Sequence, residues 1–93
     1  MFKLLKTFQI VYEQMNFSKA ATCLYISQPA VSNQIKQLER ELNIDLFQRN
    51  GRKEMLPTKQ ADLLYERTLV LLEEWEETQQ KLLNEQDEEE VCR

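Results

Sequence analysis

From about Lys59 to about Glu85 the chain contains no glycine and no proline, and this constrains the fold more than any other feature. The run is rich in good helix formers and predicts one helix of about 27 residues, roughly 40 Å long. A small domain cannot cover a helix of that length. Residues that step by three and four along it, close to a heptad pattern, are Ala61, Leu64, Thr68, Leu71, Trp75, Thr78 and Leu82. We expect this seam to pack on the domain or to pair with a second copy of the helix.

The rest of the composition indicates one small helical domain that carries this helix as an appendage. The chain has 93 residues, 42% of them apolar and 30% charged, with one glycine and two prolines. These values exclude wholesale disorder and an all-β fold, and the length excludes a dinucleotide-binding domain or a barrel. No apolar run approaches the roughly 20 residues of a membrane span, and the N-terminus lacks a signal-peptide core. We therefore expect no membrane partner.

The chain also lacks the residues that most enzymes and metal sites use. It has no histidine, no Gly-rich phosphate loop and no plausible buried pair of carboxylates. Cys23 and Cys92 lie far apart and match no metal spacing, and a reducing cytoplasm is the default compartment for such cysteines. We expect a cytoplasmic protein that is not an enzyme and holds no metal or cofactor.

Charge is distributed unevenly along the chain. The net charge is −4, but residues 1–60 carry nine Lys and Arg against five Asp and Glu, a net charge of +4. Residues 61–93 carry three basic and eleven acidic residues, a net charge of −8. Residues 1–60, the basic front of the chain, can attract phosphate, whereas the acidic residues 61–93 would be repelled by it. The two parts are therefore expected to have different partners.

Three short helices are predicted in the basic front. The first has apolar residues at helical spacing: Leu4, Leu5, Phe8, Val11, Tyr12 and Met15. Ser18 can cap the second helix, on which Ala20 and Ala21 permit close packing. Ser27 can cap the third, which tolerates Pro29 in its first turn and can end at Asn43 in a left-handed conformation. The inward stripe of the third helix is Val31, Ile35, Leu38 and Leu42.

A β-hairpin is predicted between the third helix and the long helix. Asn50-Gly51 lies between the short runs 46–49 and 53–56, and this dipeptide is a strong hairpin signal. Pro57 ends the hairpin, and Thr58 can cap the long helix that follows.

Two short helices joined by a tight turn, with small residues where they cross, describe a helix-turn-helix. The outer side of its second helix carries Gln28, Pro29, Ser32, Asn33 and Lys36 near the helix N-terminus, the end that enters a major groove. Gln and Asn side chains can form hydrogen bonds with the edge of an adenine base, and Ser can do so with the edges of several bases. Lys can reach guanine or phosphate. The hairpin adds Arg49, Arg52 and Lys53, which can lie along phosphates or enter a minor groove.

Other interpretations stay open at this point. Helix-turn-helix geometry also occurs in domains that bind no DNA, and polar outer faces are common on surface helices. In a competing interpretation the long acidic helix is a protein-interaction and dimerisation module, and the front is only a folded cap. A basic cluster at a hairpin tip and Ser-Gln-Pro at a helix start favour DNA binding, because an interaction module needs neither.

The motifs of the front resemble the N-terminal region of LysR-type transcriptional regulators. The resemblance runs from about Leu5 to about Leu64 and rests on three runs: 17–21 (Phe-Ser-Lys-Ala-Ala), 27–32 (Ser-Gln-Pro-Ala-Val-Ser) and 46–49 (Leu-Phe-Gln-Arg). It implies a winged helix-turn-helix with three helices and a two-stranded wing, followed by a long linker helix. In that family the linker helix pairs antiparallel with that of a partner, so the resemblance implies a homodimer.

The resemblance also implies roles for single residues. Those that would meet base edges and nearby phosphates are Ser27, Gln28, Pro29, Ser32, Asn33 and Lys36. Arg49, Arg52 and Lys53 would serve the wing, and Thr58 matches a position that often touches the DNA backbone. We expect two copies to pair through Leu64, Leu71, Trp75 and Leu82, and to bind an imperfect palindrome of double-stranded DNA.

The same resemblance predicts the domain organisation. Residues 1–58 would form the DNA-binding domain and residues 59–90 the linker and dimerisation helix. Residues 91–93 fall about where the first strand of a C-terminal effector domain would begin, so we expect the chain to be a piece of a longer regulator. A small-molecule effector would then act only through that absent domain.

Overall fold

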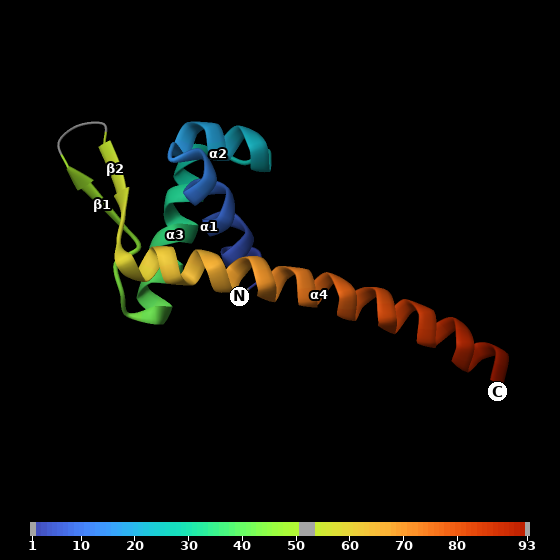
Figure 1. The fold of residues 1–93 in the computed structure, drawn as a ribbon. Coiled ribbons are helices and arrows are strands. Elements are labelled where there is room, and N and C mark those ends of the chain that lie inside the picture. Colours follow the sequence, from blue (N-terminus) through green and yellow to red (C-terminus); the bar gives the residue numbers. More distant parts are fainter. Residues whose placement is uncertain (1, 51–53, 93) are drawn as a thin grey trace.

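The computed structural model describes residues 2–50 and 54–92, and the side chains of residues 2–48 and 55–85. Its elements are α1 (Phe2–Gln14), α2 (Phe17–Leu24), α3 (Gln28–Leu42), β1 (Phe47–Asn50), β2 (Glu54–Pro57) and α4 (Lys59–Cys92). The first three helices form a bundle, the two strands form a hairpin beside it, and α4 runs along the bundle and projects away (Figure 1). This confirms the predicted fold of three helices, a two-stranded wing and a long helix.

A single hydrophobic core joins these elements, and α1 supplies the largest share of it. The buried apolar residues are Leu4, Leu5, Phe8, Val11, Ala20, Ala21, Val31, Ile35, Leu38, Leu46 and Ala61. The stripes predicted for the first and third helices therefore face inward through Leu4, Leu5, Phe8 and Val11, with Tyr12 half-buried, and through Val31, Ile35 and Leu38. Met15 instead lies beyond the end of α1 with φ 50°, and Leu42 at the end of α3 is exposed. Ala20 and Ala21 are buried where α2 meets its neighbours, as small residues at a close helix crossing must be.

The start of α2 differs from the prediction. Asn16, not Ser18, caps this helix, because the Asn16 side chain accepts a hydrogen bond from the backbone N–H of Lys19 at 2.9 Å. Asn16 has the extended backbone of a cap residue, with φ −162° and ψ 118°, whereas Ser18 already lies within the first turn. Both residue types make good caps, so the sequence alone did not distinguish them.

The ends of α3 follow the sequence prediction. The Ser27 hydroxyl accepts a hydrogen bond from the backbone N–H of Ala30 at 3.2 Å, and Pro29 lies in the first turn. Asn43 ends the helix in the left-handed region with φ 56°, a conformation that Asn tolerates. These two ends set the length of α3, and its buried residues Val31, Ile35 and Leu38 decide which of its residues face outward.

The hairpin is antiparallel, with Phe47 paired to Pro57 and Asn50 paired to Glu54. Asn50 therefore belongs to β1 rather than to the turn, and residues 51–53, which include Gly51, lie outside the described residues. The Phe47 ring lies 5.8 Å from that of Phe8 and 6.5 Å from that of Phe17 between centroids. These contacts anchor the root of the hairpin to the core.

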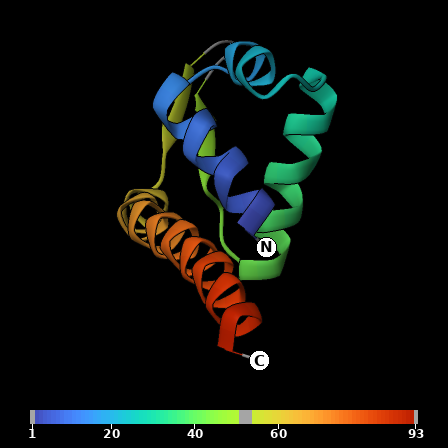
Figure 2. The same cartoon turned by 90° about the vertical axis from the view of Figure 1, so that its right-hand side faces the viewer.

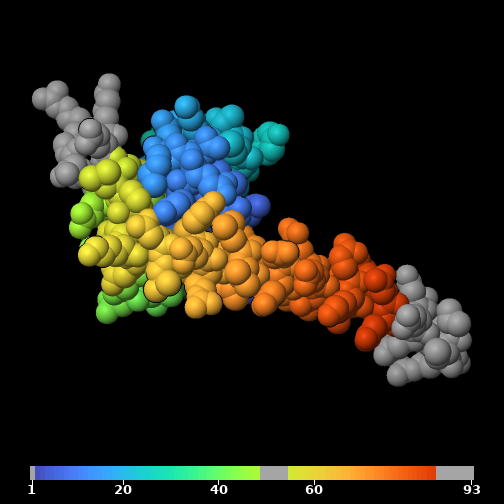
Figure 3. Space-filling model, viewed as in Figure 1, coloured from blue at the N-terminus to red at the C-terminus, as the bar shows by residue number. Residues whose placement is uncertain are grey.

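The long helix divides into a part packed on the bundle and a part that leaves it (Figure 3). Ala61 and Thr68 are buried and Leu64 packs against the core, whereas Leu71 and Leu82 are exposed. The helix continues to Cys92, beyond the predicted end near Glu85, because no breaker residue intervenes. Among the described residues no helix is both long and apolar enough to cross a membrane.

Aromatic contacts hold α4 against α1. Tyr12 and Tyr65 stack with their ring centroids 4.1 Å apart. The Tyr12 hydroxyl donates to Asp62 Oδ1 at 2.6 Å, and the Tyr65 hydroxyl donates to Glu13 Oε2 at 2.7 Å. The hydrogen bond to Asp62, together with burial, raises the pKa of Tyr12 to about 12. The bond to Glu13 and burial likewise raise the pKa of Tyr65.

Thr68 offers a test of the packing between α4 and the bundle. Its side chain is 0% exposed, and its Oγ1 has no hydrogen-bond partner among the described residues. Because burying an unpaired hydroxyl costs about 1–3 kcal/mol, Thr68→Val should raise the free energy of unfolding by about 1 kcal/mol. Urea unfolding followed by circular dichroism measures this change. A fall in stability would show that the hydroxyl has a partner in solution.

The contact between Tyr12 and Asp62 makes stability depend on alkaline pH. The folded-state pKa of Tyr12, about 12, lies above the ordinary value of 10.0, so this contact contributes fully below pH 10 and is lost as pH rises through about 12. The free energy of unfolding should fall more steeply between about pH 10 and 11.5 in the wild type than in Tyr12→Phe. Urea unfolding at several pH values checks this, and equal slopes would contradict it.

Candidate nucleic-acid interface

One face of α3 turns away from the core and gathers the side chains that the sequence predicts to read DNA. Pro29, Ser32, Asn33 and Lys36 recur at steps of three and four, and the buried stripe through Val31 occupies the opposite side. Asn33 and Lys36 are exposed, and Ser32 is half-buried. The N-terminal end of α3 lies beside α2, at the end of the bundle away from α4 (Figure 2). The N-terminal part of the polar face is thus separated from the acidic helix (Figure 2).

The first turn of α3 is held by two hydroxyl groups. Ser27 uses its hydroxyl as the helix cap, and its side chain remains exposed. Gln28 is also exposed, and its Oε1 accepts a hydrogen bond from the Ser18 hydroxyl at 3.1 Å. Ser18 therefore orients the Gln28 amide, a role that the sequence prediction missed because it treated Ser18 as a cap.

The root of the wing and α3 line one depression. This hollow has a volume of about 380 Å³, and its lining residues are Phe17, Ser32, Ile35, Lys36, Glu39 and Phe47. Ser32 and Lys36 therefore share a surface with the first residue of β1. Arg49 lies in β1 opposite Met55, but its side chain is not among those described. Arg52 and Lys53 lie outside the described residues.

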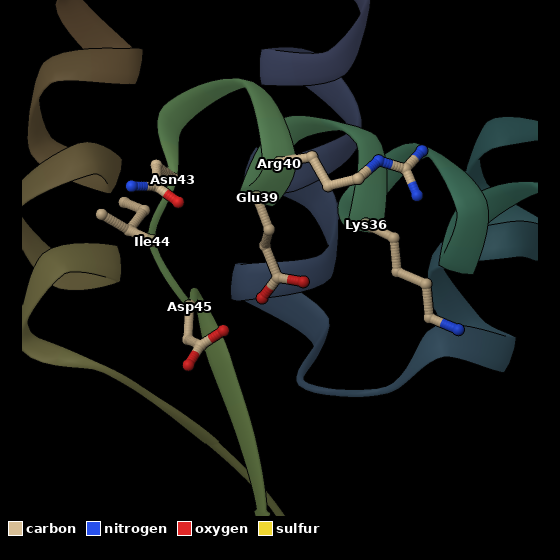
Figure 4. Close-up of a pocket in the computed structure, with 6 residues that line it drawn as sticks. All are labelled: Lys36, Glu39, Arg40, Asn43, Ile44 and Asp45. Carbon is tan, nitrogen blue, oxygen red and sulfur yellow. The ribbon is translucent and has the colours of Figure 1, made fainter.

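A second hollow, of about 460 Å³, lies at the C-terminal end of α3 and is lined by Lys36, Glu39, Arg40, Asn43, Ile44 and Asp45. Lys36 and Arg40 extend from α3 away from Asp45 (Figure 4). Glu39 instead accepts a hydrogen bond from the backbone N–H of Leu46 at 2.7 Å, which ties α3 to the strand that follows.

Arg40 is a second basic side chain on the outward polar face of α3, and the sequence prediction did not include it among the candidates. It is exposed and lies four residues after Lys36, so the two project from the same side of α3. The spacing of four residues between Lys36 and Arg40 was the sequence feature that could have indicated this. Arg40 lies away from the helix N-terminus on which the prediction concentrated.

The Thr58 hydroxyl makes contacts within the chain. Its Oγ1 donates to the carbonyl of Asp45 at 2.7 Å and accepts from the backbone N–H of Ala61 at 3.1 Å. Thr58 thus caps α4, as the sequence predicts, and also joins the two ends of the hairpin. Its contact with a DNA backbone stays a prediction.

The residues predicted to form a dimer interface do not all lie on one open surface. Leu71, Trp75 and Leu82 are exposed on α4, whereas Leu64 is half-buried against the core. Trp75 is 40% exposed and also stacks on Phe2, with centroids 5.0 Å apart. The three exposed residues are available to a second copy, and Leu64 is available only in part.

The sequence and the structure resemble those of known DNA-binding regulators. The sequence model described as "Bacterial regulatory helix-turn-helix protein, lysR family" matches residues 2–62. A probable RuBisCO transcriptional regulator of Cyanidioschyzon merolae is 47% identical over 73 residues, which cover 75% of this chain and 24% of that protein. The chain thus spans about a quarter of the length of the curated relatives it matches.

Solved structures give the same result for the fold. The BenM DNA-binding domain in complex with catB site 1 DNA has a TM-score of 0.78 and 35% identity, covering 84% of this chain and 83% of that one. The CbnR DNA-binding domain in complex with DNA has a TM-score of 0.84 and 27% identity, covering 90% and 95%. The resemblance drawn from the sequence motifs is confirmed, and the chain belongs to the bacterial LysR family of helix-turn-helix regulatory proteins.

Proposed function

We propose that this chain binds double-stranded DNA in a sequence-specific manner, as the operator-binding part of a bacterial transcriptional regulator. The observation that carries the proposal is the outward face of α3, on which Ser32, Asn33 and Lys36 lie together and exposed or half-exposed. A helix of this kind fits a major groove, and its amide, hydroxyl and ammonium groups match the donors and acceptors of base edges. The BenM and CbnR domains of the same fold are complexed with DNA.

Within this proposal the contacts divide into two kinds. Gln28, Pro29, Ser32 and Asn33 meet base edges and set the sequence, with Ser27 and Lys36 reaching adjoining bases or phosphates. Arg40 extends the basic side of α3 toward the same backbone. Arg49, Arg52 and Lys53 of the wing, together with Thr58, contact phosphate or the minor groove. The net charge of +4 on residues 1–60 supports this arrangement.

We assign residues 1–58 to DNA binding and residues 59–90 to dimerisation through α4. Two copies pair through Leu71, Trp75 and Leu82, with Leu64 at the edge of the contact, so that two α3 helices face one duplex. A two-fold dimer requires an imperfect palindrome with half-sites about one helical turn, or a multiple of it, apart. The acidic surface of α4 keeps the paired helices off the phosphates.

The proposal extends to the longer protein that the relatives represent. There, a small-molecule effector acts through a C-terminal domain beyond α4, which continues through residues 91 and 92 where the sequence suggested that this domain begins, and the regulator works in the cytoplasm, where its DNA lies. The support is that relatives named as transcriptional regulators are about four times as long as the matched segment.

Selection from a pool of random duplexes at two salt concentrations tests the function. We expect enrichment of a palindrome and an affinity that falls steeply with salt, because each neutralised phosphate releases counterions. Binding without an enriched sequence would contradict base readout. Absence of binding at low salt would favour the interaction-module interpretation, in which α4 is the functional part.

Asn33 is the sharpest single-residue test of base readout. Asn33→Ala should cost about 1–3 kcal/mol at one base position and relax the preference there, while other positions keep theirs. Competition binding against duplexes that differ at single positions measures this. Gln80→Ala, at an exposed position of α4 off the face that carries Trp75 and Leu82, is a matched control that removes an amide far from α3. If Asn33→Ala weakens all sequences equally, Asn33 does not read a base.

A further inference from the structure

We propose that two aromatic contacts between α1 and α4 hold α4 at one angle to the helix-turn-helix, and so set the half-site separation that a dimer accepts. This inference rests on the dimeric DNA binding proposed above. It assigns Tyr12, Tyr65, Phe2 and Trp75 as positioning residues, which act through the placement of α3 rather than by contact with DNA.

The first contact is a reciprocal pair at the start of α4. Tyr12 and Tyr65 stack at 4.1 Å, and each hydroxyl donates to a carboxylate on the opposite helix, at 2.6 Å to Asp62 and 2.7 Å to Glu13. Hydrogen bonds to ionised acceptors are about twice as strong as neutral ones and are directional. The pair therefore fixes the rotation of α4 about its axis as well as its distance from α1.

The second contact lies further along both helices. The Phe2 and Trp75 rings stack with centroids 5.0 Å apart and an interplanar angle of 8°. Phe2 lies ten residues before Tyr12 on α1, and Trp75 lies ten residues after Tyr65 on α4, so the helices run antiparallel. At 1.5 Å per residue the two contacts are about 15 Å apart along each helix. Two fixed points define the direction of α4.

Among the described side chains beyond Trp75, those of residues 76–85, the helix has no comparable support. Residues 76–85 are all exposed. From Tyr65 to Cys92 the helix runs about 40 Å, so a tilt of about 10° would move its far end by about 7 Å. That shift corresponds to about two base pairs at about 3.4 Å each. Small changes at the two contacts therefore change which half-site separations a dimer can span.

The angle itself can be measured within one chain. Cys23 is an exposed free cysteine on α2, and Gln80 is exposed on α4. A nitroxide pair at Cys23 and Gln80→Cys, in a Cys92→Ser background and diluted with unlabelled chain, gives the intrachain distance by pulsed electron resonance. Tyr12→Phe with Tyr65→Phe removes both hydroxyl groups and keeps the rings, so it should broaden or shift the distance distribution. Tyr25→Phe removes the same group from a side chain that is 94% exposed, and should not.

The consequence for DNA is measured with the half-site recovered by selection. A series of duplexes carries two copies of the half-site, and their separation increases by one base pair from one duplex to the next. A duplex with a single half-site measures the affinity of one recognition helix alone. In Tyr12→Phe/Tyr65→Phe the ratio of affinities between the best and the next separation should fall by at least about two- to tenfold, because two hydrogen bonds are lost and a single one corresponds to about that factor. Single-copy affinity should stay unchanged. Phe2→Leu, which removes the other stack, should act in the same direction.

The outcomes separate this inference from the proposed function. An unchanged distance distribution in the double variant overturns the role of the tyrosine pair in holding the angle. A changed distribution with an unchanged separation preference overturns its role in setting half-site spacing. A wild type that binds two copies no better than one overturns the proposed dimeric binding, whatever the distances show. Loss of single-copy affinity in the double variant would place the tyrosines in recognition and contradict the inference.

Discussion

The packing of α1 into the centre of the molecule is the constraint on which the other elements depend. Phe8 is 0% exposed, and its ring lies 5.8 Å from Phe47 of the wing and 5.9 Å from Tyr12, which contacts α4. One helix thereby positions the second and third helices, the hairpin and the linker helix. Truncation of a buried Phe typically costs about 3–5 kcal/mol, a large part of the stability of a domain this small. The polar face of α3 is therefore held in place by buried apolar contacts, which would not touch the DNA proposed to bind there.

The two halves of α4 face different environments: the first packs on the bundle, and the second is exposed to solvent. Ala61 and Thr68 are buried against the bundle, whereas Leu71 and Leu82 on the same seam are exposed. The seam thus packs within the chain over the N-terminal half of α4, and over the C-terminal half it is exposed and available to a second chain. Trp75 stands at the boundary, stacked on Phe2 yet 40% exposed. The acidic charge of this helix lies away from the N-terminal end of α3, which keeps it clear of the surface proposed for phosphate.

Local signals predicted the ends of α3. Ser27 indicated its start because a hydroxyl can accept a hydrogen bond from the first turn, and Asn43 indicated its left-handed end because few residues other than glycine tolerate that conformation. The start of α2 was misjudged because Asn16 and Ser18 are equally good caps, and only the backbone decides which is extended. The breaker-free run placed the end of α4 near Glu85 and the family resemblance placed it near residue 90, and the helix reaches Cys92 because no residue in between stops it. Arg40, proposed above to extend the basic side of α3, could have been predicted from its spacing of four residues from Lys36.

The sequence by itself determined the helix faces, the basic charge of residues 1–60 and the polar side chains of α3, since each follows from periodicity or from adjacent residues, and its motifs resembled those of the family. Only the tertiary structure decided which partners meet across the chain. The hydrogen bonds from Tyr12 to Asp62 and from Tyr65 to Glu13 join residues about fifty positions apart. No local pattern encodes them, because they exist only once the core has brought α1 and α4 together. The angle of the long helix, and with it the proposed spacing of two DNA-reading surfaces, depends on that non-local packing.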